Sequence, residues 1–247
     1  MTFLEQLGGP VRMLGGLVRA VARRGMPWRA VLQSLHDTGN RSAWLVASGM
    51  AFFGVVLVTI ANAQAKRFTG NLAVIGPAYL ELLVREFGPL TATLLAAARG
   101  GARDASELAS MSVNEQVEAL EMSAGDPLAE LVAPRVLAGV IAVPVLGLLG
   151  TATASLSAAA AAQFLFESNG AAFLDARYLD YADLASGLIK GLLCGLYIPL
   201  VASWHGLRAQ GGSTAVGLAT TDGVVASVLG SLLIVLLVGI VFRVLGA

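Results

Sequence analysis

Residues 136–166 read VLAGVIAVPVLGLLGTATASLSAAAAAQFLF, a run of 31 residues without a charged side chain. A helix of about 20 apolar residues is long enough to cross the hydrocarbon core of a bilayer. The run therefore predicts a membrane-spanning helix that is tilted, kinked at Pro144 or longer than the bilayer is thick.

The composition of the whole chain agrees with that stretch. Of 247 residues, 56% are hydrophobic and 13% are charged, whereas soluble domains have about 25% charged residues. This excludes a soluble globular enzyme and a disordered protein and indicates a polytopic membrane protein. The 16 basic residues match the 16 acidic ones, so no basic excess points to a nucleic-acid partner. The single cysteine, Cys194, excludes an intrachain disulfide and a cysteine-based metal site.

Four further apolar segments predict spans, at residues 43–63, about 77–98, about 184–205 and 223–242. We therefore expect an all-α membrane protein with an N-terminal cytoplasmic or interfacial segment, 1–42, and a five-span domain, 43–247. The first residues lack the apolar core of a secretory signal, so the first span is expected to direct insertion.

The basic residues set the expected orientation, because they gather on the cytoplasmic side of membrane proteins. Five spans place ten of them on the side of the N-terminus and four on the other side. The ten are Arg12, Arg19, Arg23, Arg24, Arg29, Arg41, Arg99, Arg103, Arg135 and Arg208, and the four are Lys66, Arg67, Arg177 and Arg243. The N-terminus is therefore expected in the cytoplasm and the C-terminus in the periplasm.

The N-terminal segment predicts an amphipathic helix over residues 3–21. Its apolar residues recur every three or four positions and form one stripe, made of Leu4, Leu7, Val11, Leu14, Val18 and Val21. Such a helix either lies in the headgroup layer, where its arginines would favour anionic lipid, or packs on the protein's own spans.

The polar stretch after the second span predicts a short helix over residues 113–124. Ser112 and Glu115 have the spacing of a capping box, and Gly125 with Asp126-Pro127 would end the helix. Its apolar residues Val113, Val117, Leu120 and Ala124 share a face, and its other faces are acidic. An acidic helix held between two spans on the cytoplasmic side either transmits force from a soluble partner or is a solvated connector.

Charged residues inside the spans are costly in a bilayer and therefore indicate function. The second span carries Glu81, Arg85 and Glu86, and the fourth carries Lys190. Glu81 and Arg85 are four residues apart and can pair on one helix, or Arg85 can hold a lipid phosphate. Lys190 either extends its amine outward to the membrane surface or forms an internal ion pair that fixes helix packing.

Several kinds of chemistry lack their motif in this sequence. It contains no phosphate-binding P-loop and no nucleophile elbow. Its two histidines, His36 and His205, lack the spacing of metal ligands. We therefore expect no catalytic residue and no metal site in this chain, and a lipid-modifying enzyme is disfavoured.

Four ordered stretches resemble the MlaE/YrbE permeases, the membrane subunits of ABC-type lipid transporters that work with MCE-domain proteins. They are VREFGP at 84–89 followed by ARG at 98–100, ELASMSVNEQVEALEMSAGDP at 107–127, PRVLA at 134–138 followed by Pro144, and GLRA at 206–209 followed by Gly211-Gly212 and ATT at 219–221.

The resemblance implies a non-enzymatic subunit of a bacterial inner-membrane phospholipid transporter. Such a permease forms a dimer around an outward-facing phospholipid cavity, capped in the periplasm by an MCE-domain protein. A cytoplasmic ABC ATPase binds ATP and Mg and engages the short helix between spans two and three. By this resemblance the coupling residues are Glu115, Gln116, Glu118, Ala119 and Leu120, and the cavity residues are Glu81, Arg85, Glu86 and Lys190.

Three positions depart from the family pattern. Ser112, Leu218 and Asp222 stand where the family has arginines. Two consequences stay open: the chain pairs with a paralogue that supplies the missing charges, or it is a non-transporting scaffold that anchors the ATPase and the MCE partner.

Overall fold

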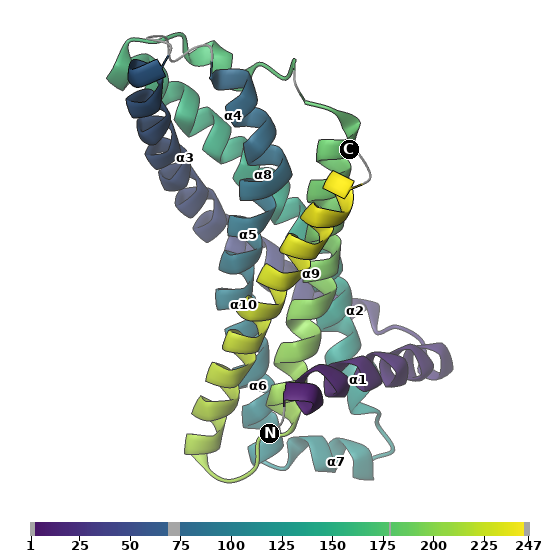
Figure 1. Cartoon of the computed structure of the whole chain (residues 1–247). Helices are drawn as coiled ribbons and strands as arrows, with labels where there is room; N and C mark the ends of the chain where they lie inside the picture. Colours follow the sequence, from purple (N-terminus) through teal and green to yellow (C-terminus); the bar gives the residue numbers. More distant parts are fainter. Residues whose placement is uncertain (1–2, 69–74, 178, 245–247) are drawn as a thin grey trace.

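The computed structural model describes residues 3–68, 75–177 and 179–244, and every regular element among them is a helix. Figure 1 shows long helices running side by side, with α1 (Phe3–Arg24) and α7 (Gln116–Met122) lying across one end of the bundle. The other elements are α2 (Trp28–Leu35), η1 (His36–Asn40), α3 (Arg41–Phe68), α4 (Gly76–Leu82), η3 (Leu83–Phe87), α5 (Gly88–Ala96), η4 (Ala97–Gly101), α6 (Ala102–Val113), η5 (Leu128–Val132), α8 (Ala133–Phe166), η6 (Gly170–Leu174), α9 (Tyr181–Leu207) and α10 (Ser213–Val244).

Four helical segments of the described residues are long and apolar enough to cross a membrane. They are Trp28–Arg67, Leu128–Phe166, Tyr181–Leu207 and Ser213–Val244, and they contain four of the five predicted spans. The remaining predicted span lies in a helical run from Gly76 to Val113 that passes through two π-helical turns, η3 and η4. Charged residues interrupt the apolar character of this run.

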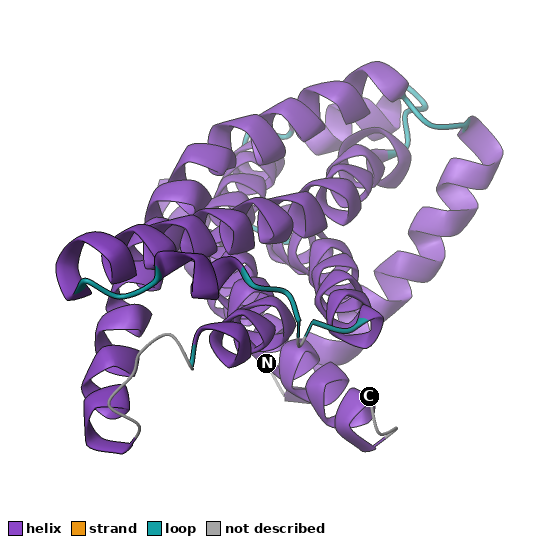
Figure 2. Ribbon diagram, turned by 90° about the horizontal axis from the view of Figure 1, so that it is seen from above, coloured by secondary structure: helices purple, strands orange, loops and turns teal. Residues whose placement is uncertain are grey.

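The bundle is built around α8. One side of α8 packs on α3 through Val46, Met50, Ala154 and Ala158, and its other side packs on α9, which in turn packs on α10. The end-on view in Figure 2 shows the helices packed around one another. At the α8–α9 crossing, a Cβ on Gly139 would lie 2.4 Å from the carbonyl oxygen of Gly195, and one on Gly195 would lie 2.4 Å from that of Gly139. The small residues therefore permit backbone contact between these helices.

The amphipathic stripe predicted for the N-terminal helix is only partly correct. Met13 and Leu17 of α1 are buried against Val132, Val136 and Leu200, while Leu14 and Val21 are half-buried at the same contact. Val11 and Val18 are exposed, by 69% and 63%. The side chains of Leu4 and Leu7 lie outside the described part of the chain. One face of α1 thus packs on the protein's own spans.

The helix predicted at 113–124 is shorter in the structure. Val113 ends α6, Asn114 and Glu115 form a turn, and α7 begins at Gln116. The capping box is wrong: Ser112 Oγ instead contacts the carbonyl oxygens of Leu207 and Ala209, at 3.3 and 3.1 Å. Carbonyl groups at the end of a helix need hydrogen-bond donors. The hydroxyl of Ser112 therefore donates to the end of α9 and does not cap the helix that follows it in the sequence.

The end of α7 also differs from the expected pattern. Ala124, and not Gly125, adopts the left-handed conformation, with φ 60°. The N–H of Gly125 donates to the carbonyl oxygen of Leu120 at 2.8 Å. A Cβ on Gly125 would lie 2.5 Å from Leu120 Cδ1, so glycine is needed here for close packing.

Two glycines of α8 and α9 test the backbone contact. Gly195→Ala should lower the free energy of unfolding by about 1–3 kcal/mol, because the added methyl group forces the two helices apart. Gly147→Ala is the matched control, since no heavy atom lies within 4 Å of its Cβ position. Denaturant unfolding in detergent measures both. Equal stability of the two variants would contradict the account.

Candidate functional site

Four charged side chains join η3 of the Gly76–Val113 run to α9, and we call them the η3–α9 charge cluster: Arg85, Glu86, Asp183 and Lys190. Lys190 Nζ lies 2.7 Å from Glu86 Oε2, and the Lys190 side chain is fully buried. Arg85 Nη1 lies 3.2 Å from Asp183 Oδ1. Of the two alternatives for Lys190, the structure favours the internal ion pair and not the outward extension to the membrane surface, because the amine is held inside the protein by a carboxylate.

Pro89 explains a second contact of Lys190. Proline has no N–H, so Pro89 cannot donate to the carbonyl oxygen of Arg85 four residues earlier in the helix. Lys190 Nζ donates to this carbonyl oxygen at 2.7 Å. The buried amine of Lys190 thus has two acceptors in the 84–89 motif. One is the carbonyl oxygen of Arg85, which Pro89 leaves without its usual donor, and the other is the carboxylate of Glu86.

Asp183 has two partners at the start of α9. Its Oδ2 accepts the N–H of Asp180 at 3.0 Å as part of a capping box, and its Oδ1 faces Arg85. Helix formation therefore fixes the carboxylate that orients the guanidinium. The sequence did not single out this role, although the Asp-x-x-Asp spacing before an apolar run was a signal for the cap.

A cavity of about 620 Å³ opens beside this cluster. Glu81, Arg85 and Glu86 line one side, and Gly239 and Arg243 of α10 line the other. Among the described residues, Arg85 forms ion pairs with Asp183 and, at 4.0 Å, with Glu86, whereas no ion pair joins it to Glu81, the partner that the spacing suggested. A Cβ on Gly239 would lie 3.2 Å from Glu86 Oε1, so α10 approaches the carboxylate through a glycine. Three predicted cavity residues thus line one cavity, with Lys190 behind Glu86.

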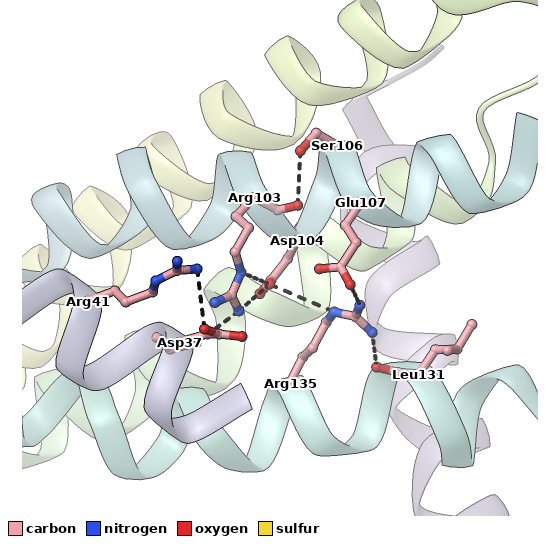
Figure 3. Close-up of polar contacts among 9 residues, drawn as sticks. Asp37, Arg41, Arg103, Asp104, Ser106, Glu107, Leu131 and Arg135 are labelled. Carbon is pink, nitrogen blue, oxygen red and sulfur yellow. Dashed lines mark hydrogen bonds and ion pairs between the residues drawn. The ribbon is translucent and has the colours of Figure 1, made fainter. Parts of the chain in front are cut away.

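A second set of charges, absent from the predicted sites, lies at the other end of the Gly76–Val113 run. This α6–α8 charge cluster contains Arg103, Asp104, Glu107 and Arg135 (Figure 3). Arg103 Nη2 lies 2.8 Å from Asp104 Oδ1, and Arg135 Nη2 lies 2.9 Å from Glu107 Oε1. Arg135 Nε also lies 3.8 Å from Asp104 Oδ1. Two helices that are separated in the sequence by residues 114–132 are thereby held together.

The α6–α8 charge cluster also reaches the start of the first span. Arg103 Nη2 donates to Thr38 Oγ1 of η1 at 3.1 Å. Asp104 is buried, and its carboxylate faces the guanidinium groups of both Arg103 and Arg135. Such a network resists separation, because removing one partner leaves a buried charge without compensation.

The predicted coupling residues lie on a helix with no buried residue. Gln116, Glu118 and Ala119 of α7 are exposed, as is Glu115, which precedes the helix with φ 59°. Leu120 is half-buried against Gly125. A left-handed conformation costs a non-glycine residue about 1–2 kcal/mol, so the chain accepts strain to turn α7 away from α6.

Arg24 connects α1 to the segment after α7. Its guanidinium donates to the carbonyl oxygen of Ala124 and lies 3.7 Å from Glu130 Oε1. Gly25, with φ 82°, ends α1 directly after this arginine. The far end of α7 is therefore tied to the helix that lies across the bundle.

Within the described residues, no group of histidine, cysteine and acidic side chains could hold a metal ion.

The buried ion pair is tested by a double-mutant cycle. Glu86→Gln should lower the free energy of unfolding by about 3 kcal/mol, because Lys190 stays buried without a carboxylate. Adding Lys190→Met should recover most of that loss, since an apolar pair replaces the charged one. Denaturant unfolding measures the cycle. Additive effects of the two substitutions would show that the pair is not coupled.

Comparison with known proteins identifies the family. The family described as "Permease MlaE" matches residues 31–244. A probable ABC transporter permease protein of Rickettsia typhi is 34% identical over 199 residues, which cover 80% of this chain and 76% of the relative. The intermembrane phospholipid transport system permease protein MlaE of Haemophilus influenzae is 28% identical over 231 residues, 90% of this chain and 86% of the relative.

A plant protein is also similar. TRIGALACTOSYLDIACYLGLYCEROL 1 of Arabidopsis thaliana, a chloroplast protein, is 29% identical over 218 residues, which cover 87% of this chain and 62% of the relative. The match to the family extends from α2 to the end of α10 and includes both charge clusters and α7. The chain therefore belongs to the MlaE permease family.

Proposed function

We propose that this chain is the membrane subunit of an ABC-type phospholipid transporter and is driven by a separate ATPase that binds ATP and Mg. The observation that carries the proposal is the helical run Gly76–Val113. It begins at a charged cavity, ends next to the exposed helix α7, and is tied to its neighbours by a charge cluster near each end.

The proposed orientation has five spans, with the Gly76–Val113 run as the second. Its charged residues at positions 85, 86, 104 and 107 pair with α8 or α9, which lowers their cost in a bilayer. The N-terminus, α7 and the α9–α10 connection then face the cytoplasm, and the cavity and the C-terminus face the periplasm of the bacterial inner membrane. Figure 1 supports this division, since α7 and the last turn of α10 lie toward opposite ends of the bundle.

At the periplasmic end, the cavity beside the η3–α9 charge cluster suits a phospholipid headgroup. Arg85 and Arg243 can receive a phosphate, while Leu236 and Ile240 offer apolar surface to acyl chains. The helix α10 leaves long apolar side chains exposed, including Leu229, Leu233 and Leu237. This surface suits a second permease copy or a paralogue, which would enclose the cavity beneath an MCE-domain protein.

At the cytoplasmic end, α7 suits the ATPase. Its exposed acidic side chains can contact a soluble partner, and its firm connection is to α6, which the α6–α8 charge cluster fixes to the spans. A displacement of α7 by the ATPase would therefore reach the helix that lines the cavity. Nucleic acid has no part in this function.

The alternative role as a non-transporting scaffold rests on Ser112, Leu218 and Asp222. The hydrogen bonds of Ser112 to the end of α9 explain why a serine stands at this position. Leu218 and Asp222, in contrast, are exposed on α10. Lipid-stimulated ATP turnover that requires this chain would exclude the scaffold; ATPase assembly without turnover would support it.

Charge reversal tests the docking role of α7. Glu115→Lys should reduce co-purification of the ATPase about tenfold, which corresponds to a loss of about 1.4 kcal/mol. Glu167→Lys is the matched control, since Glu167 is also an exposed glutamate with positive φ, 50°, beside a helix end. Quantitative pull-down measures both. Equal capture by the two variants would count against docking on α7.

The lipid cavity is tested separately. Arg85→Ala should lower the amount of phospholipid that co-purifies with the complex several-fold, because the variant loses one of the two arginines that line the cavity. Arg29→Ala, an exposed arginine in α2, should leave it unchanged. Mass spectrometry of the extracted lipid is the measurement, and retention of the normal amount by Arg85→Ala would refute the cavity's role.

A further inference from the structure

The helix α1 presents three distinct sides. At about 100° per residue, Met13, Leu17 and Ala20 form the side that is buried on the protein. Val11 and Val18 form an exposed apolar side. Arg12, Arg19 and Arg23 fall within about 40° of one another and form an exposed basic side.

The apolar side of α1 continues onto a spanning helix. An apolar groove of about 400 Å³ lies between the two, lined by Val18, Val21 and Ala22 of α1 and by Leu137 and Val140 of α8. Because α8 is one of the helices long and apolar enough to cross a membrane, this groove opens toward acyl chains. The apolar side of α1 therefore faces the bilayer interior.

The direction of the basic side follows from the other two. It lies roughly 100° from the apolar side and roughly 100° from the packed side. With the apolar side toward the bilayer interior, the three arginines point sideways, away from the bundle and into the headgroup layer. Within the described part of the chain, no carboxylate lies within ion-pair distance of these guanidiniums.

We propose that α1 is a docking surface for anionic phospholipid of the leaflet on which it lies. An acyl chain occupies the α1–α8 groove, and Arg12, Arg19 and Arg23 contact the headgroup phosphates. A guanidinium is a suitable donor for phosphate oxygens, and a basic side chain near an anionic membrane surface gains about 1 kcal/mol. Figure 1 shows α1 at the opposite end of the bundle from α4, whose Glu81 and Leu82 line the cavity described above, so lipid binding at α1 needs no transport activity.

The experiment uses the full chain in nanodiscs of phosphatidylcholine with and without phosphatidylglycerol. A polarity-sensitive dye is attached to Val18→Cys in a Cys194→Ala background, and native mass spectrometry counts the retained phosphatidylglycerol. Arg19→Gln with Arg23→Gln should weaken retention about tenfold or more. Arg19→Lys with Arg23→Lys should retain most of it. The dye should report an apolar environment.

The matched control removes two exposed charges from the other end of the bundle, Lys66→Gln with Arg67→Gln, and should leave retention unchanged. Equal loss of phosphatidylglycerol from the Arg19/Arg23 variant and from the Lys66/Arg67 variant would overturn the proposal. A dye signal that reports an aqueous environment at position 18 would also overturn it. Loss of ATPase capture in Arg19→Gln with Arg23→Gln, with the dye in water, would assign the surface to a protein partner and also overturn it.

Discussion

Charged side chains inside an apolar bundle must find partners, and this constraint governs the helical run Gly76–Val113. Near its start, Arg85 and Glu86 pair with Asp183 and Lys190 of α9. Toward its end, Asp104 and Glu107 pair with Arg135 at the start of α8. A charge without a partner in such a place costs several kcal/mol. The run is thus fixed to the bundle by ion pairs at two levels, and it connects the cavity to α7 as one body.

The helix α7 contrasts with the run that carries it. It has no buried residue, and it is bounded by Glu115 and Ala124, which both adopt left-handed conformations. Besides its connection to α6, α7 is held at the turn that follows it, where the carbonyl oxygen of Ala124 accepts a hydrogen bond from Arg24 of α1. A helix with so little core of its own is positioned by its connections, so a partner that holds α7 acts directly on α6.

The sequence predicted the parts of this structure that depend on local pattern. Apolar runs such as 136–166 located four spans, because length and hydropathy decide that question. The sequence did not predict the pairings between distant segments. Arg85 with Asp183 and Asp104 with Arg135 cannot be found by spacing rules, which compare neighbours on one helix. For the same reason the sequence assigned Ser112 to a helix cap, whereas its hydroxyl contacts the end of α9, and it left two alternatives for Lys190, which only the carboxylate of Glu86 decides.

The central claim is that the α7 end of the bundle faces the cytoplasm and is covered by an ATPase. Its most direct test is labelling of Glu118→Cys with a membrane-impermeant maleimide, in a Cys194→Ala background, in sealed vesicles of either orientation. The account predicts reaction in inside-out vesicles, with protection when the ATPase is bound, and reaction of Glu167→Cys only in right-side-out vesicles. Labelling of Glu118→Cys from the periplasmic face, or no protection by the ATPase, would contradict it.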